Sequence, residues 1–242
     1  MNMKEVKRKC WKKDEVKKEM TFIHYCRRSL SMYVAYPFIL LKIPPNAITN
    51  LMTFVGIASA LSFLTGRYWM GILGIILYHL YQFMDCLDGN VARYWKKTSL
   101  KGIYLDSLSH TIVHPAMHIC MGYGTFIKTG SIVFLYIGII IAFLLISTQG
   151  LKNARYWILT SHNIKDNNMV TTTHYKGKEQ SIVSLLKKTY VSLYDNRMNF
   201  LIIFVVINRI EWFLIGFLAF VFVRFILFAY FYSKFDEDSK GE

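Results

Sequence analysis

Charged side chains are scarce in this chain, and acidic ones are the scarcest. Asp, Glu, Lys and Arg make up 18% of the 242 residues, against 54% hydrophobic residues. A soluble domain of this size carries about 25% charged residues, so the composition excludes an ordinary soluble protein and indicates a membrane protein. The net charge is +14. Because the basic residues gather near the N-terminus and beside apolar runs, we expect anionic lipid and phosphorylated substrates as partners, and no nucleic acid.

Cysteine is also rare, and no two cysteines lie close together in the sequence. The spacing excludes a CxxC metal or redox motif, and nothing indicates an oxidising compartment. We therefore expect free thiols at all four positions, which are Cys10, Cys26, Cys86 and Cys120.

The first part of the chain lacks the apolar stretch of a cleaved signal peptide. Ten Lys or Arg residues lie within positions 1–30, so we expect the N-terminus to stay in the cytosol. Basic pairs mixed with aromatic residues indicate that residues 1–43 form a basic segment with an amphipathic helix on the inner leaflet. A disordered tail is an equal alternative for residues 1–18. Pro44 and Pro45 end this segment, and Asn46 is placed to cap the next helix.

Apolar runs of about twenty residues, the length that crosses a bilayer, occur repeatedly between residues 44 and 234. The fold prediction is therefore an all-α polytopic membrane protein with six transmembrane helices, five being the alternative. The expected spans are residues 47–64, 69–93, 99–126 and 131–151, and two within 198–234 that turn near Asn208. Residues 152–197 are predicted to be a polar cytosolic linker, with a possible surface helix around 182–186, and residues 235–242 a tail.

Basic residues follow the second predicted span, whereas the turns near Arg67 and Lys128 carry little charge. The positive-inside rule then places both termini in the cytosol. The end of the second span and the start of the third meet at the cytosolic face of the cytoplasmic membrane.

Three aspartates and a histidine are predicted to converge at that face. Asp85 and Asp88 share one face of a helix, and Asp106 and His110 share a face of the next helix. Three close carboxylates repel one another, so the site needs cations. Oxygen ligands favour Mg²⁺ or Mn²⁺, and two such ions can clamp a pyrophosphate.

Small and basic residues accompany these carboxylates. Gly89, Ala92 and Gly102 allow a ligand or a second helix to approach the backbone closely. Arg93 can make forked hydrogen bonds to a phosphate oxygen. Helix packing and snorkelling explain each residue taken alone, but their spacing against three aspartates favours a substrate site.

The residues from Asp85 to Asp106 follow the pattern D-x2-D-G-x2-A-R-x8-G-x3-D. This pattern resembles the signature of the CDP-alcohol phosphotransferase family. The Pro-Asn-x-x-Thr motif that ends at Thr49, at the start of the first predicted span, is also similar to that family. The resemblance implies transfer of a substituted phosphate from a CDP-linked donor to an alcohol acceptor, possibly phosphorylated, with release of CMP. It also implies a homodimer and two divalent cations. The implied metal ligands are Asp85, Asp88 and Asp106, and the implied CDP contacts are Gly89, Ala92 and Arg93.

His110 stands where the family signature has a fourth aspartate, usually assigned as the general base. Three interpretations remain open. His110 is the base, since a neutral imidazole suits this task near neutral pH; or it is a metal ligand; or the site has lost catalysis and keeps binding. The last gives an alternative function, a catalytically silent membrane protein that binds CDP-lipid or metal.

Other polar residues are harder to assign. His114 and His118 continue the face of His110 and suit either a proton relay or hydrogen bonds between packed helices. Thr49 and Asn50 could hydrogen-bond a substrate. A phosphate could be bound by the basic residues Lys152, Arg155 and Arg224, although anchoring at the inner leaflet explains the first two equally well.

Overall fold

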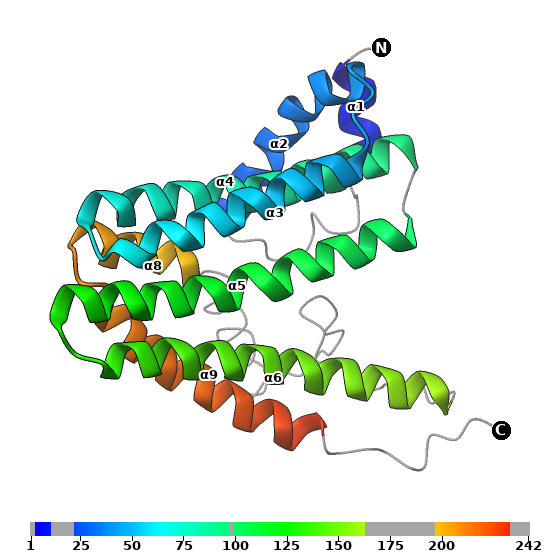
Figure 1. Cartoon of the computed structure of the whole chain (residues 1–242). Helices are drawn as coiled ribbons and strands as arrows, with labels where there is room; N and C mark the ends of the chain where they lie inside the picture. The colour runs from blue at the N-terminus through cyan, green and yellow to red at the C-terminus, as the bar shows by residue number, and fades with distance from the viewer. Residues whose placement is uncertain (1–2, 11–21, 97–98, 163–196, 233–242) are drawn as a thin grey trace.

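The chain folds into long α-helices that lie side by side (Figure 1). This computed structural model describes residues 3–10, 22–96, 99–162 and 197–232, and these ranges contain no β-strand. The all-α prediction is confirmed. The helices are α1 (Met3–Cys10), α2 (Phe22–Leu40), α3 (Pro45–Ser62), the 3-10 turn η1 (Phe63–Thr65), α4 (Tyr68–Trp95), α5 (Leu100–Thr129), α6 (Val133–Ser161), α8 (Arg197–Val206) and α9 (Ile210–Tyr232).

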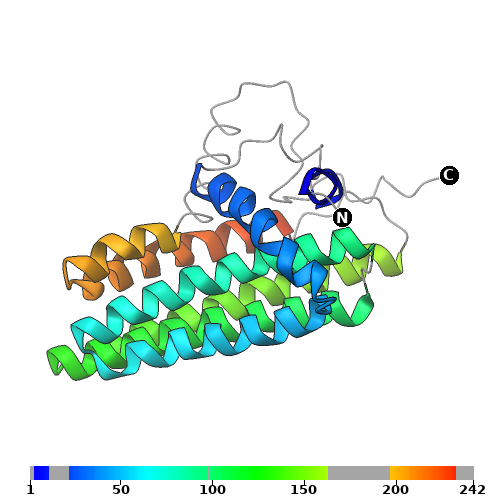
Figure 2. The same ribbon diagram turned by 90° about the horizontal axis from the view of Figure 1, so that it is seen from above.

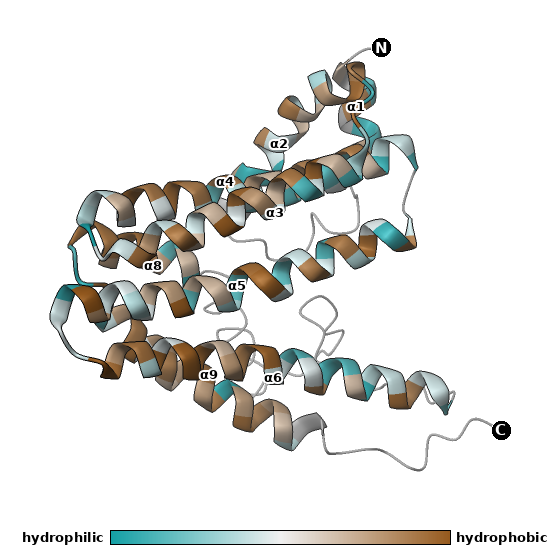
Figure 3. Ribbon diagram, in the orientation of Figure 1, coloured by the Kyte–Doolittle hydropathy of each residue, from teal (hydrophilic) through white to brown (hydrophobic). Residues whose placement is uncertain are grey.

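Four of the described helices are long and apolar enough to cross a membrane, which supports the prediction of an integral membrane protein. They span Pro45–Thr65, Tyr68–Trp95, Val133–Ser161 and Ile210–Tyr230. α5 has 30 residues but carries a polar stripe, and α8 has ten residues, about 15 Å of helix. Six spans thus stay a prediction. Figure 3 shows α6 changing from hydrophobic to hydrophilic toward its C-terminal end.

Residues with positive φ end several of the long helices. Gly66 (φ 64°) follows η1, Gly130 (φ 73°) follows α5, and Lys96 (φ 50°) follows α4. Left-handed residues at these positions stop a helix and reverse the chain. The reversals make α3 and α4, and α5 and α6, antiparallel pairs in contact. As a result, the end of α4 and the start of α5 lie at the same end of the bundle (Figure 1).

The N-terminal helices lie across that end of the molecule. α2 crosses the long helices at an angle, and α1 lies near the last turns of α4 (Figure 2). Both contact α4. Val6 and Cys10 of α1 are completely buried, so α1 is docked on the bundle. An amphipathic helix on the membrane surface stays a prediction.

Close packing of α3 against α4 and α5 depends on small residues. A Cβ placed on Gly56 would lie 2.7 Å from Val113 and 2.8 Å from Tyr81. Nearby, Ser59 Oγ donates to the carbonyl of Gly74 at 2.7 Å. The missing side chain at position 56 therefore lets three helices meet next to Tyr81.

Two local predictions were wrong. Asn46 does not cap α3, because the N-cap is Pro44 and Pro45 occupies the first helical position. Proline has no N–H there that would need a cap. The helix predicted to end at residue 151 continues as α6 to Ser161, so it includes Lys152 and Arg155. The four described cysteines are free thiols, as expected. The possible helix near residues 182–186 lies outside the described ranges.

Replacing Gly56 with Ala should destabilise the bundle, because the new methyl group would overlap Val113 and Tyr81. Overpacking of this kind costs about 1–3 kcal/mol. Thermal unfolding of the purified protein in detergent measures the effect. Gly150→Ala is the matched control, since nothing lies within 4 Å of a Cβ at that position. Equal unfolding temperatures for the two variants would contradict the packing argument.

Candidate functional site

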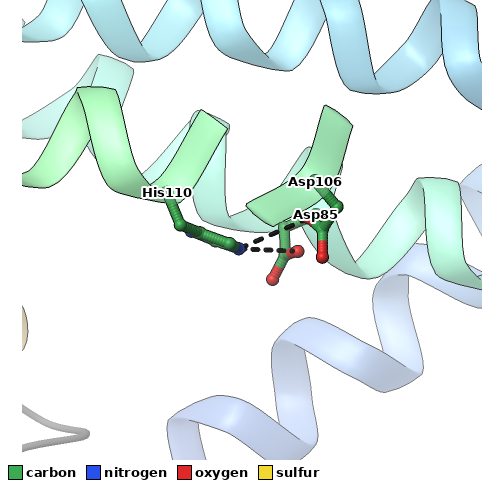
Figure 4. A group of neighbouring side chains, drawn as sticks. All are labelled: Asp85, Asp106 and His110. Atoms are coloured by element: carbon green, nitrogen blue, oxygen red, sulfur yellow. Dashed lines mark ion pairs between the residues drawn. The ribbon is translucent and has the colours of Figure 1, made fainter. Parts of the chain in front are cut away.

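Asp85 of α4 and Asp106 and His110 of α5 converge where these helices meet. His110 Nε2 lies 3.4 Å from Asp85 Oδ1 and 3.4 Å from Asp106 Oδ1 (Figure 4). One ligand atom from each residue lies within 4.8 Å of the others, and all three side chains are half-buried. Among the described residues this is a group whose geometry suits a metal ion.

The start of α5 positions this group. Ser99 caps the helix by accepting the Gly102 N–H at 3.0 Å, which fixes the first turn. A Cβ on Gly102 would lie 3.0 Å from Asn46 Oδ1, so the first turns of α3 and α5 approach closely. One turn further along α5, Asp106 and His110 are four residues apart and face α4 together.

Asp88 has a different environment from the other two aspartates. It is buried, with 8% exposure, and its Oδ2 accepts a hydrogen bond from Thr49 Oγ1 at 2.7 Å. The charges of Asp85 and Asp106 act on it, but it is not in the group of converging ligand atoms. Thr49, expected to contact substrate, contacts this carboxylate. The hydrogen bond joins α3 to the site.

Arg93 reaches back along α4 over Gly89. A Cβ on Gly89 would lie 3.2 Å from Arg93 Nη1, so the glycine leaves room for the guanidinium. Arg93 Nη2 donates to Asn90 Oδ1 at 2.6 Å, and Nε donates to the carbonyl of Cys10 at 3.1 Å. Ala92 is half-buried beside Arg93.

His110 is fixed from the other side by a tyrosine. Its Nδ1 lies 2.6 Å from Tyr81 Oη, and Tyr81 is completely buried. Since Nδ1 faces Tyr81, Nε2 is the nitrogen that faces the carboxylates. Sequence reasoning missed Tyr81, although it lies four residues before Asp85 and therefore on the same face of α4.

Two further histidines, His114 and His118, follow His110 along α5 into the bundle. The His114 ring stacks on that of His110, with centroids 5.4 Å apart, and its Nδ1 lies 3.4 Å from Tyr78 Oη. His118 Nδ1 lies 2.7 Å from the His114 carbonyl, and its ring stacks on Phe217 of α9. These contacts favour the interpretation of His118 as a histidine packed between helices.

Basic residues of α6 and α9 lie together. Arg155 and Arg224 are each 6% exposed. Lys152 Nζ and the Arg224 guanidinium carbon both lie 5.1 Å from the centre of the Phe228 ring. The Lys152 contact joins α6 to α9, whereas the Arg224 contact lies within α9.

The donor set of the converging group fits a divalent cation. Carboxylate oxygens suit Mg²⁺ and Mn²⁺, and an imidazole nitrogen is accepted by Mn²⁺ and later transition metals. The carboxylates of Asp85 and Asp106 lie near that of Asp88, and a bound cation would offset the repulsion among the three. The three residues can therefore hold a cation at the end of the bundle.

Comparison with protein families agrees with this geometry. The model of the CDP-alcohol phosphatidyltransferase family matches residues 42–207, more than half of the chain. The chain therefore belongs to the CDP-alcohol phosphatidyltransferase family, whose members are in general transferases of lipid synthesis that use divalent metals. No match is found among curated proteins.

Replacing Thr49 with Val should remove the side-chain hydrogen bond that the buried Asp88 carboxylate accepts from α3. Losing a hydrogen bond to a charged group costs about 1.5–3 kcal/mol, so the unfolding temperature in detergent should fall. Thr53→Val is the matched control, because Thr53 Oγ1 donates only to the carbonyl of Thr49 in its own helix. The interpretation fails if both variants unfold at the wild-type temperature.

Proposed function

We propose that this protein is a CDP-alcohol phosphotransferase. It transfers a substituted phosphate from a CDP-linked donor to the hydroxyl of an alcohol acceptor, with release of CMP, in phospholipid or glycolipid synthesis. The observation that carries this proposal is the convergence of Asp85, Asp106 and His110 within the matched family region. The acceptor is an alcohol that can itself carry a phosphate.

Two divalent cations, Mg²⁺ or Mn²⁺, would be held by Asp85, Asp88 and Asp106. When bound, they would stabilise charge on the attacking and leaving oxygens. The protein's part is to position the carboxylates: α4 supplies two and α5 the third, and Thr49 fixes the orientation of Asp88.

His110 is the proposed general base. In the tautomer whose Nδ1–H donates to Tyr81 Oη, Nε2 carries a lone pair and faces the carboxylate group. That nitrogen is the one that can take the proton of the acceptor hydroxyl. The hydroxyl oxygen then attacks the phosphorus, and the bond from phosphorus to the CMP oxygen breaks.

Substrate contacts are proposed for Arg93, Gly89, Ala92 and Gly102 at the ends of α4 and α5. Arg93 would bind the diphosphate of the donor, since its guanidinium makes charged hydrogen bonds to phosphate oxygens. Thr49 would act on substrate through Asp88. The site would open to the cytosol at the inner leaflet, in a six-span homodimer of the cytoplasmic membrane with both termini cytosolic.

A specific observation favours a second function. His110 Nε2 lies equally far from two carboxylates, so a protonated imidazole would offset one of their two negative charges without a metal ion. This arrangement suits a catalytically silent membrane protein that binds CDP-lipid.

Release of CMP tests the enzymatic proposal. Purified protein with Mg²⁺ or Mn²⁺, a panel of CDP-linked donors and alcohol acceptors should release CMP, and chelation with EDTA should stop it. Asp106→Asn should lower the rate at least about a hundredfold, because the amide cannot balance a cation's charge. Glu211→Gln at the other end of the bundle is the control. Folded protein that releases no CMP with any pair would contradict the proposal.

Two substitutions at position 110 separate the two functions. His110→Ala should lower CMP release at least about a hundredfold, as expected on loss of a general base. His110→Asp, which introduces the family residue, should retain more activity than Ala. If only the Asp variant turns over, the natural protein is the silent binder. Wild-type rates in the Ala variant would exclude His110 as the base.

A further inference from the structure

Arg93 is fixed by contacts that reach three helices. Asn90 Oδ1 accepts from Arg93 Nη2 at 2.6 Å, and Asn90 Nδ2 donates to Ser31 Oγ of α2 at 2.8 Å. The carbonyl of Cys10, the last residue of α1, accepts from Arg93 Nε at 3.1 Å. Ser31 Oγ in turn donates to the carbonyl of Arg28 at 2.9 Å.

Asn90 is well suited to orient this guanidinium. It is completely buried, and both ends of its carboxamide are used, one as acceptor and one as donor. Exchanging the two ends would lose the hydrogen bond from Arg93, because the amide nitrogen cannot accept it. A guanidinium is planar, so acceptors at Nε and Nη2 fix its plane, and Nη1 then lies beside Gly89. Because Asp85, Gly89 and Arg93 are spaced by four residues, this places the guanidinium on the face of α4 that carries Asp85.

α1 is held against α4 by several contacts and can therefore help to fix the Arg93 guanidinium. Val6 and Cys10 are completely buried, and Lys9 Nζ lies 4.7 Å from the centre of the Tyr94 ring. Cys10 Sγ also donates to the carbonyl of Asn90 at 3.3 Å. An eight-residue helix is marginal by itself in water, so its contacts with α4 and α2 are what order it.

We propose that Asn90 is a positioning residue for donor binding and that α1 is a wall of the donor site. Together they hold the Arg93 guanidinium in the orientation that binds the diphosphate of a CDP-linked donor. This inference rests on the proposed function. Neither Asn90 nor α1 belongs to the signature, in which position 90 is variable.

Binding of CDP with Mg²⁺, measured by isothermal titration calorimetry in detergent, tests the role of Asn90. Asn90→Ala should weaken binding about tenfold, the effect of one charged hydrogen bond. Arg93→Ala should weaken it at least as much. The double variant should bind like Arg93→Ala alone, because Asn90 acts through Arg93. Asn153→Ala, an exposed asparagine on α6, is the control and should bind like wild type.

A second pair of variants tests α1 without altering α4. Val6→Asp places a charge on the buried face of α1 and should weaken CDP binding about as much as Asn90→Ala. Arg8→Asp changes an exposed position of the same helix and should bind CDP within about threefold of wild type, since an exposed charge contributes little.

The outcomes separate this inference from the proposed function. If wild-type protein does not bind CDP, both are overturned. If wild type binds CDP and Asn90→Ala or Val6→Asp binds equally well, only the inference is overturned. Additive losses in the double variant would also overturn it, because a residue with a merely structural role weakens binding whether or not Arg93 is present.

Discussion

Carboxylate charge at the end of a membrane bundle is the constraint on which this structure depends. Asp85 and Asp106 point at one another across α4 and α5, with His110 Nε2 between them, and Asp88 is buried one turn away. Charges brought out of water are tolerated only with partners. His110 Nε2 lies 3.4 Å from two of the carboxylates, and the Thr49 hydroxyl donates to the third. The same arrangement that makes the fold possible makes the site ready for cations, because the negative charge is only partly offset by protein groups.

The sequence was a good guide wherever local rules decide the structure. Spacing by three or four residues placed Asp106 and His110 on one face, and the order of the predicted spans placed the end of α4 and the start of α5 at one end of the bundle. The sequence was a poor guide where the last residue of a helix is decided by tertiary contacts. α6 continues to Ser161 because buried Arg155 and Leu159 pack inside the bundle, although the residues around them look like a polar linker.

The direction of each side chain was the least predictable part. Asp88 turns to Thr49, which is 39 residues away in sequence, and Arg93 turns to Cys10, which is 83 residues away. The hydrogen-bond partners of Asp88 and Arg93 depend on how α1 and α3 pack against α4. Hydrophobic periodicity carries no information about this packing. Tyr81 is an intermediate case: its place on the face of Asp85 follows from spacing, but its contact with His110 Nδ1 requires the register of α5 against α4.

Nearly all of these contacts originate from one stretch of α4, from Tyr81 to Arg93. In a continuous helix each residue advances the chain by about 1.5 Å and turns it by about 100°, so the sequence spacing fixes where each side chain points. An insertion or deletion of a single residue inside this stretch would rotate everything beyond it away from α1, α3 and α5 at once. The contacts with three other helices therefore fix the spacing within these thirteen residues.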